Sequence, residues 1–189
     1  SLVGSEMCIR DSNKAYPMLD FATNEIGPPQ NPLHPLNESP NNTGANVLPP
    51  ARIPMIWYPY GVSDKWPMLD KGSRSAMAGP VYYEPNSPSK TAFPKYYEGK
   101  LFIYEWARSW IKVVSFDEDW NVTKIEPFLP NEKFNKPIDM EFDQDGNMYV
   151  LEYGANYFAN NIEAKLVKIE YNRGNRLPHA VIQATKIRG

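Results

Sequence analysis

Short apolar stretches follow one another at nearly regular intervals over residues 76–171. Between them lie turn signals such as Glu98-Gly99, Asp117-Glu118-Asp119 and Asp143-Gln144-Asp145-Gly146. Short alternating runs at a spacing of roughly 8–12 residues are typical of an all-β sandwich, barrel or propeller. The pattern predicts strands at Ala78–Tyr83, Lys100–Trp106, Trp110–Phe116, Asn121–Phe128, Pro137–Phe142, Asn147–Tyr153 and Ala164–Tyr171.

These strands fall into two groups, which predicts two adjacent antiparallel meanders. Four strands occupy residues 78–128 and three occupy residues 137–171. A propeller blade of four strands needs roughly 40–50 residues, and the spacing here agrees with that length. The residues therefore favour about two propeller blades.

The stretch from Asn13 to about Trp66 has a different pattern. It is rich in proline pairs and other turn dipeptides, which prevent long helices. It also carries large apolar residues, which a free linker would lack. We therefore expect an ordered loop that wraps a scaffold and ends in one short strand at Pro54–Tyr58.

Both ends of the chain differ from the middle. Residues 1–12 (SLVGSEMCIRDS) have no periodicity and no signal-peptide pattern, and are interpreted as a sequencing or cloning scar, with a genuine terminus as the alternative. The single cysteine, Cys8, lies in this stretch, so no intrachain disulfide can form. Residues 177–189 follow a turn-rich linker and look like the start of another strand.

Composition narrows the possible partners. The formal net charge is −2, which argues against a surface for nucleic acid. No apolar run approaches the roughly 20 residues needed for a membrane-spanning helix. The 12 tyrosines and 5 tryptophans favour strands and also supply ring surfaces for a ligand.

Five sequence blocks resemble the glucose/sorbosone dehydrogenase family. They are AMAGPVY (76–82), FPKYYEGKLFIYEW (93–106), PIDMEF (137–142), DGNMYVLEYG (145–154) and LVKIEYNRGNR (166–176). The match is closest to the large bacterial multidomain branch of that family. The resemblance implies that residues 13–176 are the C-terminal part of a six-bladed β-propeller. Residues 177–189 would then be a linker and the first strand of an Ig-like domain of the polycystic-kidney-disease type.

The same resemblance implies a function. Members of this family oxidise aldoses by hydride transfer to pyrroloquinoline quinone, assisted by calcium and a histidine base, and a cytochrome c is a possible electron acceptor. A periplasmic or extracellular location would follow. The base comes from an earlier blade, and neither His34 nor His179 lies on a matching motif. We therefore name no catalytic residue and expect this chain alone to be inactive.

Three cations near strand ends are the candidate cofactor-binding residues. Arg108 lies in a short connection between two tryptophans, Lys136 precedes the Pro137–Phe142 strand, and Arg74 lies just before the first strand of the meander. In the related quinone enzymes a cation at such a turn reaches the cofactor. The alternative for each is an ordinary surface cation. Convergence of the three at one end of a propeller would suit a tricarboxylate cofactor.

Two alternatives to an enzyme remain open from the sequence. One is a propeller that binds carbohydrate on its aromatic rings without oxidising it, and the other is a structural module of a large secreted protein. The Asp143-x-Asp145-Gly146 turn resembles the start of a calcium loop, but no glutamate stands at the twelfth position. A hairpin is therefore the preferred interpretation, and no metal ligands are named.

Overall fold

The computed structural model describes residues 16–20, 22–52, 54–157 and 160–172. The chain divides into two compact units, Ser1–Tyr58 and Pro59–Gly189, which we describe separately. The expected scar at residues 1–12 and the expected Ig-like strand at residues 177–189 lie outside the described residues. The described chain is all-β, with two short 3₁₀ turns, η1 (Pro67–Leu69) and η2 (Lys95–Tyr97), and no α-helix.

The first unit contains a β-hairpin where the sequence predicts only loop. Strands β1 (Tyr16–Asp20) and β2 (Glu25–Gln30) pair antiparallel, with Pro17 opposite Pro29. Proline is tolerated here because both strands of a two-stranded ribbon are edges, where an N–H can be missing without breaking a ladder. The high proline content therefore led to the prediction of a loop where the chain forms a hairpin.

The strand expected at Pro54–Tyr58 is wrong. The structure has bends and irregular backbone there, and no described strand lies beside it. A β-strand needs a neighbour to satisfy its N–H and C=O groups, and apolar composition alone supplies none. The stretch instead leads from the first unit into the second.

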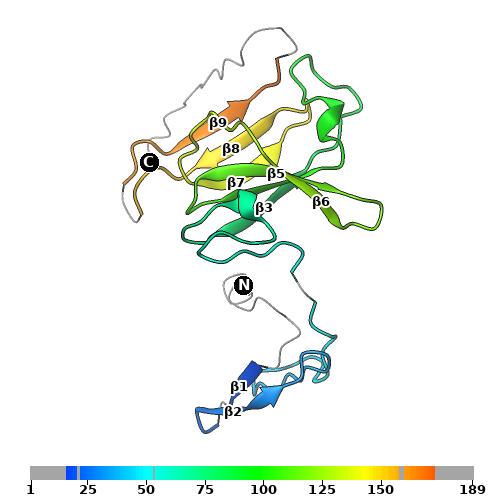
Figure 1. Cartoon of the computed structure of the whole chain (residues 1–189), viewed down its shortest axis with the longest axis vertical. Helices are drawn as coiled ribbons and strands as arrows, with labels where there is room; N and C mark the ends of the chain where they lie inside the picture. Colours follow the sequence, from blue (N-terminus) through cyan, green and yellow to red (C-terminus); the bar gives the residue numbers. More distant parts are fainter. Residues whose placement is uncertain (1–15, 21, 53, 158–159, 173–189) are drawn as a thin grey trace. The chain divides into compact units, whose positions relative to one another are not determined.

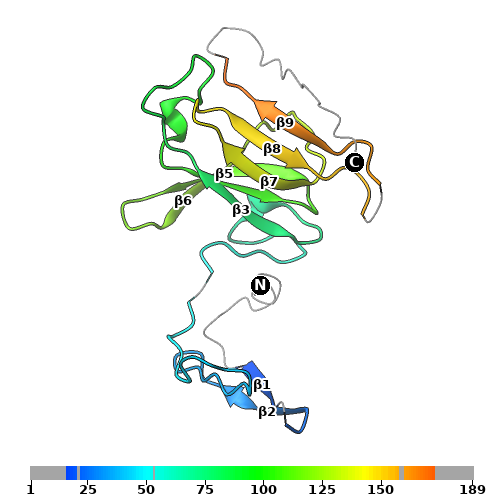
Figure 2. The same cartoon turned by 180° about the vertical axis from the view of Figure 1, so that it is seen from behind.

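The second unit holds the two predicted antiparallel meanders, with four and three strands (Figure 1, and from behind in Figure 2). Adjacent strands in the chain are adjacent in each sheet, which confirms the prediction for residues 76–171. The first sheet comprises β3 (Ala76–Val81), β4 (Leu101–Glu105), β5 (Trp110–Phe116) and β6 (Val122–Pro127). The second comprises β7 (Pro137–Phe142), β8 (Met148–Glu152) and β9 (Lys165–Ile169).

The two sheets share one hydrophobic core, in which β7 contacts β3 and β4. Gly79 permits this approach, because a Cβ atom there would lie 3.3 Å from Met140 Sδ of β7, and it would also lie 2.9 Å from the Phe102 carbonyl oxygen of the neighbouring strand β4. The Tyr104 hydroxyl also donates a hydrogen bond across the interface to the Ile138 carbonyl at 3.2 Å. The buried core residues are Tyr82, Phe93, Phe102, Tyr104, Ile111, Val113, Phe128, Phe134, Met140, Met148, Val150 and Val167.

The outer face of the first sheet, away from this core, is also covered. Along β5, Ile111 and Val113 enter the core, so Lys112 and Val114 point to the opposite face, where both are buried. Lys112 Nζ lies 3.5 Å from Asp70 Oδ2, just after η1. The segment 59–75 therefore lies on this outer face.

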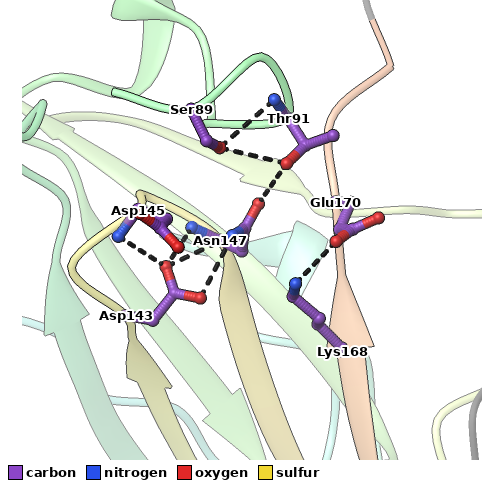
Figure 3. Close-up of polar contacts among 7 residues, drawn as sticks. All are labelled: Ser89, Thr91, Asp143, Asp145, Asn147, Lys168 and Glu170. Carbon is purple, nitrogen blue, oxygen red and sulfur yellow. Dashed lines mark hydrogen bonds and ion pairs between the residues drawn. The ribbon is translucent and has the colours of Figure 1, made fainter. Parts of the chain in front are cut away.

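Two hairpins, at 117–121 and 143–147, are closed by the same turn. In the second, Asp143 Oδ1 accepts the N–H groups of Asp145 at 3.0 Å and Asn147 at 2.8 Å (Figure 3). In the first, Asp117 Oδ1 accepts the equivalent N–H groups of Asp119 and Asn121 at the same two distances. This Asp-x-Asp-x-Asn pattern confirms the hairpin interpretation.

The long β3–β4 connection fastens the second of these turns to the first sheet. The Thr91 hydroxyl donates to Asn147 Oδ1 at 2.8 Å, and Thr91 is itself held by Ser89 (Figure 3). Backbone hydrogen bonds join Ser89 N–H to the Asp145 carbonyl at 3.2 Å and Phe93 N–H to the Gly146 carbonyl at 3.0 Å. These contacts join the β3–β4 connection to the β7–β8 turn, so the two meanders are held together at this end as well as through the core.

Candidate functional site

The candidate site is a groove of about 750 Å³ at the opposite end of the two sheets. In a meander, alternate connections lie at the same end, so the β4–β5, β6–β7 and β8–β9 connections gather there. The loop before β3 joins them. The residues that bear on its chemistry are Ser75, Trp106, Lys136, Tyr153, Asn156 and Tyr157.

Three aromatic rings form the main apolar surface of the groove. The Trp106 ring packs edge-to-face on Tyr153, with centroids 5.7 Å apart, and on Tyr157, with centroids 5.3 Å apart. Trp106 and Tyr153 are partly buried, while Tyr157 is exposed. Such perpendicular pairs hold the rings in fixed positions.

A buried glutamate fixes each of the two inner rings. Glu105 precedes Trp106 and accepts the backbone N–H groups of Ser75 and Arg108, the latter at 2.5 Å. Glu152 precedes Tyr153 and is buried in the equivalent place at the end of β8, where it accepts the Asn135 N–H at 3.1 Å. Each carboxylate thus ties a strand end to the start of its neighbouring strand.

This repeat was not predicted from the sequence. The signal was present as Phe-Ile-Tyr-Glu-Trp at 102–106 and Tyr-Val-Leu-Glu-Tyr at 149–153, each an apolar strand that ends in glutamate and a large aromatic residue. Aromatic residues in strands are usually assigned to the core. Only the structure shows that these two meet in one groove.

Lys136 is the predicted cation that lines the groove. Its Nζ lies 4.3 Å from the centre of the Trp106 ring, within range for a cation–π interaction. Its backbone has a φ of 55° and its carbonyl accepts the Tyr153 N–H at 3.0 Å. The residue is thereby fixed to the end of β8.

Arg108 has a different role in the structure. Its guanidinium donates to five backbone carbonyls, at distances of 2.7–2.9 Å. All five N–H donors of an arginine are engaged by such a set. The acceptors belong to Pro59, Leu69, Asp70, Gly72 and Ser73. Arg108 therefore holds the segment that covers the outer face of the first sheet, and it does not line the groove.

Arg74 lies at the same end of the sheets but stacks elsewhere. Its guanidinium carbon is 4.1 Å from the centre of the Tyr60 ring, and the residue does not line the groove. The topology thus brings the loops of Arg74, Arg108 and Lys136 to one end, as the alternation of connections implies. Of the three, only Lys136 contributes to the groove wall.

Arg108, one of the three cations assigned to the implied tricarboxylate cofactor, does not fit that role. Arg108 already uses its donors on carbonyl groups, so binding a carboxylate would require the release of the 59–73 segment. Within the described ranges there is no group of three or more His, Cys, Asp or Glu residues that could hold a metal ion. The Asp143 carboxylate is occupied by N–H donors.

A second cavity, of about 760 Å³, lies within the first unit. It is lined by the β1–β2 hairpin and the following loop, including Asp20 and His34. Hydrogen bonds from the backbone N–H groups of Ala22 and Thr23 lower the pKa of the Asp20 carboxyl, which closes the turn. Much of the remaining lining is proline and other apolar side chains, so we place the candidate site in the aromatic groove.

No protein-family model, curated protein or solved structure matches this chain. Among the residues that the structure describes, no helix is both long enough and apolar enough to span a bilayer.

Proposed function

We propose that the groove binds a carbohydrate and that the two sheets are neighbouring blades of a β-propeller. The observation that carries the first part is the ring set of Trp106, Tyr153 and Tyr157 in one groove. One face of a pyranose ring presents C–H groups that pack on aromatic surface, while its hydroxyls need polar partners at the rim. The groove supplies such partners in Ser75, Asn156 and Lys136.

The propeller part of the proposal is supported by the packing of the meanders. A four-stranded and a three-stranded antiparallel sheet share a core, and each presents a glutamate–aromatic pair at the same end. Successive units that repeat a motif at equivalent positions are typical of propeller blades. The resemblance to the glucose/sorbosone dehydrogenase family gives the same architecture.

Oxidation of the bound sugar by a quinone is the further proposal that rests on this resemblance. It assigns substrate binding to the groove and leaves the catalytic base to another part of the propeller. The retained support within this chain is Lys136, the one predicted cation on the groove wall. Titration of pyrroloquinoline quinone with calcium into the full chain tests it, and competition with sugar would support a shared site.

Calorimetric titration of the full chain with D-glucose and methyl glucoside tests carbohydrate binding. We expect Trp106→Ala to weaken binding at least about tenfold, which corresponds to about 1.4 kcal/mol. Trp120→Ala is the matched control, because Trp120 is 67% exposed in the β5–β6 turn at the other end of the sheet. We expect it to leave binding unchanged.

Tyr157→Ala provides a second variant in case loss of Trp106 disturbs the fold. Its ring is exposed, so its removal should leave the melting temperature unchanged while it weakens sugar binding. Carbohydrate binding at this groove is contradicted if wild-type protein shows no saturable heat. Equal affinities of the Trp106→Ala and Trp120→Ala variants would also exclude it.

A further inference from the structure

The charge distribution of the groove is one-sided. Lys136 is a cation, and among the residues that the structure describes no aspartate or glutamate lines the groove. Four other polar residues of the lining are neutral and can form hydrogen bonds: Ser75, Tyr153, Asn156 and Tyr157. A ligand in this groove therefore meets a positive charge beside aromatic surface.

Among the lysines that the structure describes in the second unit, five have a carboxylate within 4.0 Å of Nζ, in the pairs Lys100–Glu126, Lys112–Asp70, Lys124–Glu126, Lys165–Glu152 and Lys168–Glu170. Of the described lysines outside these pairs, Lys136 is the one that lines the groove. For Lys136 no carboxylate of the described residues lies within ion-pair distance, and its contact is the Trp106 ring. An ammonium group in this position can pair with the anion of a ligand without breaking an ion pair within the protein.

The two buried glutamates at this end do not supply the missing counterion. Glu105 accepts backbone N–H groups of Ser75 and Arg108. Glu152 accepts the Asn135 N–H and lies 3.4 Å from Lys165 Nζ. Both carboxylates thus have other partners, and both are buried and are not among the residues that line the groove.

We infer that the groove selects a pyranose that carries an anionic substituent, such as a uronic acid, with the anion at Lys136 and the ring on the aromatic surface. This inference rests on the proposed carbohydrate binding and adds the substrate class. A charge-assisted hydrogen bond from an ammonium group is stronger than a neutral one, so an acidic sugar gains more from Lys136 than a neutral sugar does. Partial exposure of the groove makes that gain dependent on salt.

Calorimetry on the full chain at low salt, with D-glucose, D-glucuronate and D-glucose 6-sulfate, tests the inference. We expect glucuronate to bind at least about fivefold more tightly than glucose, with the preference reduced at 0.5 M salt. Lys136→Met should abolish the preference, because it should weaken glucuronate binding at least about fivefold more than glucose binding. Lys136→Arg should retain the preference, because the charge remains.

Lys133→Met is the matched control for loss of one positive charge. Lys133 is exposed in the same β6–β7 connection but does not line the groove, so the preference should persist in this variant. Tight binding of both acidic sugars indicates recognition of negative charge, and tight binding of glucuronate alone indicates recognition of the carboxylate. Both results support the inference.

Two results overturn it, and they can be told apart. If glucose and glucuronate bind equally, and Lys136→Met changes neither, the groove is a neutral-sugar site and the proposed function stands alone. If neither sugar binds, both the inference and the proposed function fail. Circular dichroism and the melting temperature of each variant exclude misfolding as the cause.

Discussion

The two sheets of the second unit are built alike at their ends and differently on their faces. Each has a glutamate–aromatic pair at the groove end and an Asp-x-Asp-x-Asn turn at the far end. In the first sheet, neighbouring residues of β5 such as Val113 and Val114 are buried on both faces. In the second, Leu151 and Leu166 pair across β8 and β9 on the outer face and are 39% and 45% exposed.

This difference shows that the repeated motifs at the sheet ends do not determine whether the outer face of a sheet is covered. The cover on the first sheet comes from the segment 59–75, which has no counterpart on the second among the described residues. Leu69 of that segment is fully buried, and the five hydrogen bonds of Arg108 hold the segment in place. Arg108, which lies outside the repeat, therefore helps to hold the cover on the first sheet.

Removal of this arginine should have the largest effect on stability. Arg108→Ala leaves five carbonyl groups without their donor and frees the covering segment, so we expect a loss of at least about 3 kcal/mol. Arg108→Lys should lose less, because an ammonium group can still donate to up to three carbonyls. Urea denaturation measures both. Limited proteolysis should show new cleavage within 59–75 in the alanine variant, and an unfolding midpoint equal to that of wild type would contradict this role.

The two turns should respond differently to alanine at the residue with positive φ. Gly146 has a φ of 81°, and a Cβ atom there would lie 2.9 Å from Ala92 Cβ. Gly146→Ala should therefore cost about 2 kcal/mol, from left-handed backbone strain and from displacement of the β3–β4 connection. Trp120 already has a side chain at a φ of 64°, so Trp120→Ala should cost less than about 1 kcal/mol. Thermal unfolding of both variants measures the two losses of stability. Equal losses would show that Ala92 can move away from the added Cβ atom without a measurable loss of stability.

The smallest expected difference concerns the aspartates of the two turns and their dependence on pH. For Asp143, partial burial acts to raise the pKa, but the hydrogen bonds from Asn147 and Asp145 outweigh it and lower the pKa. For Asp117, hydrogen bonds from Asn121 lower the pKa. A carboxyl with a lowered folded-state pKa contributes stability above its ordinary pKa of about 3.9, and this is lost as pH falls through the lowered value.

Asp143→Asn and Asp117→Asn should therefore each flatten the fall in melting temperature between about pH 5 and pH 2. The effect of Asp143→Asn should be the larger, because its turn also holds Asn147, which receives the Thr91 hydroxyl from the other sheet. Differential scanning fluorimetry across this range measures both variants. Profiles parallel to that of wild type would show that neither aspartate changes its pKa on folding.

Local pattern predicted much of this fold. The alternation of apolar residues located the seven strands of the two meanders, and the Asp-rich turns located two of their hairpins, because these signals depend on neighbours in the chain. The local pattern gave wrong predictions in two places. At β1–β2 the high proline content predicted a loop, but the two strands pair. At Pro54–Tyr58 an apolar run predicted a strand, but no described strand lies beside it. In both cases the deciding factor was the presence or absence of a partner strand.

The sequence by itself determined that Arg74, Arg108 and Lys136 lie near strand ends, and the alternation of connections determined that their loops share one end. The tertiary structure alone decided what each does. Arg108 is bonded to carbonyls 35–49 positions away in the chain, while Lys136 lies over Trp106. A side chain's hydrogen-bond partners depend on which distant segment folds against it, and no local period records that choice. For this reason two cations that look equivalent in the sequence have different roles: Arg108 holds the segment 59–75, and Lys136 lines the groove.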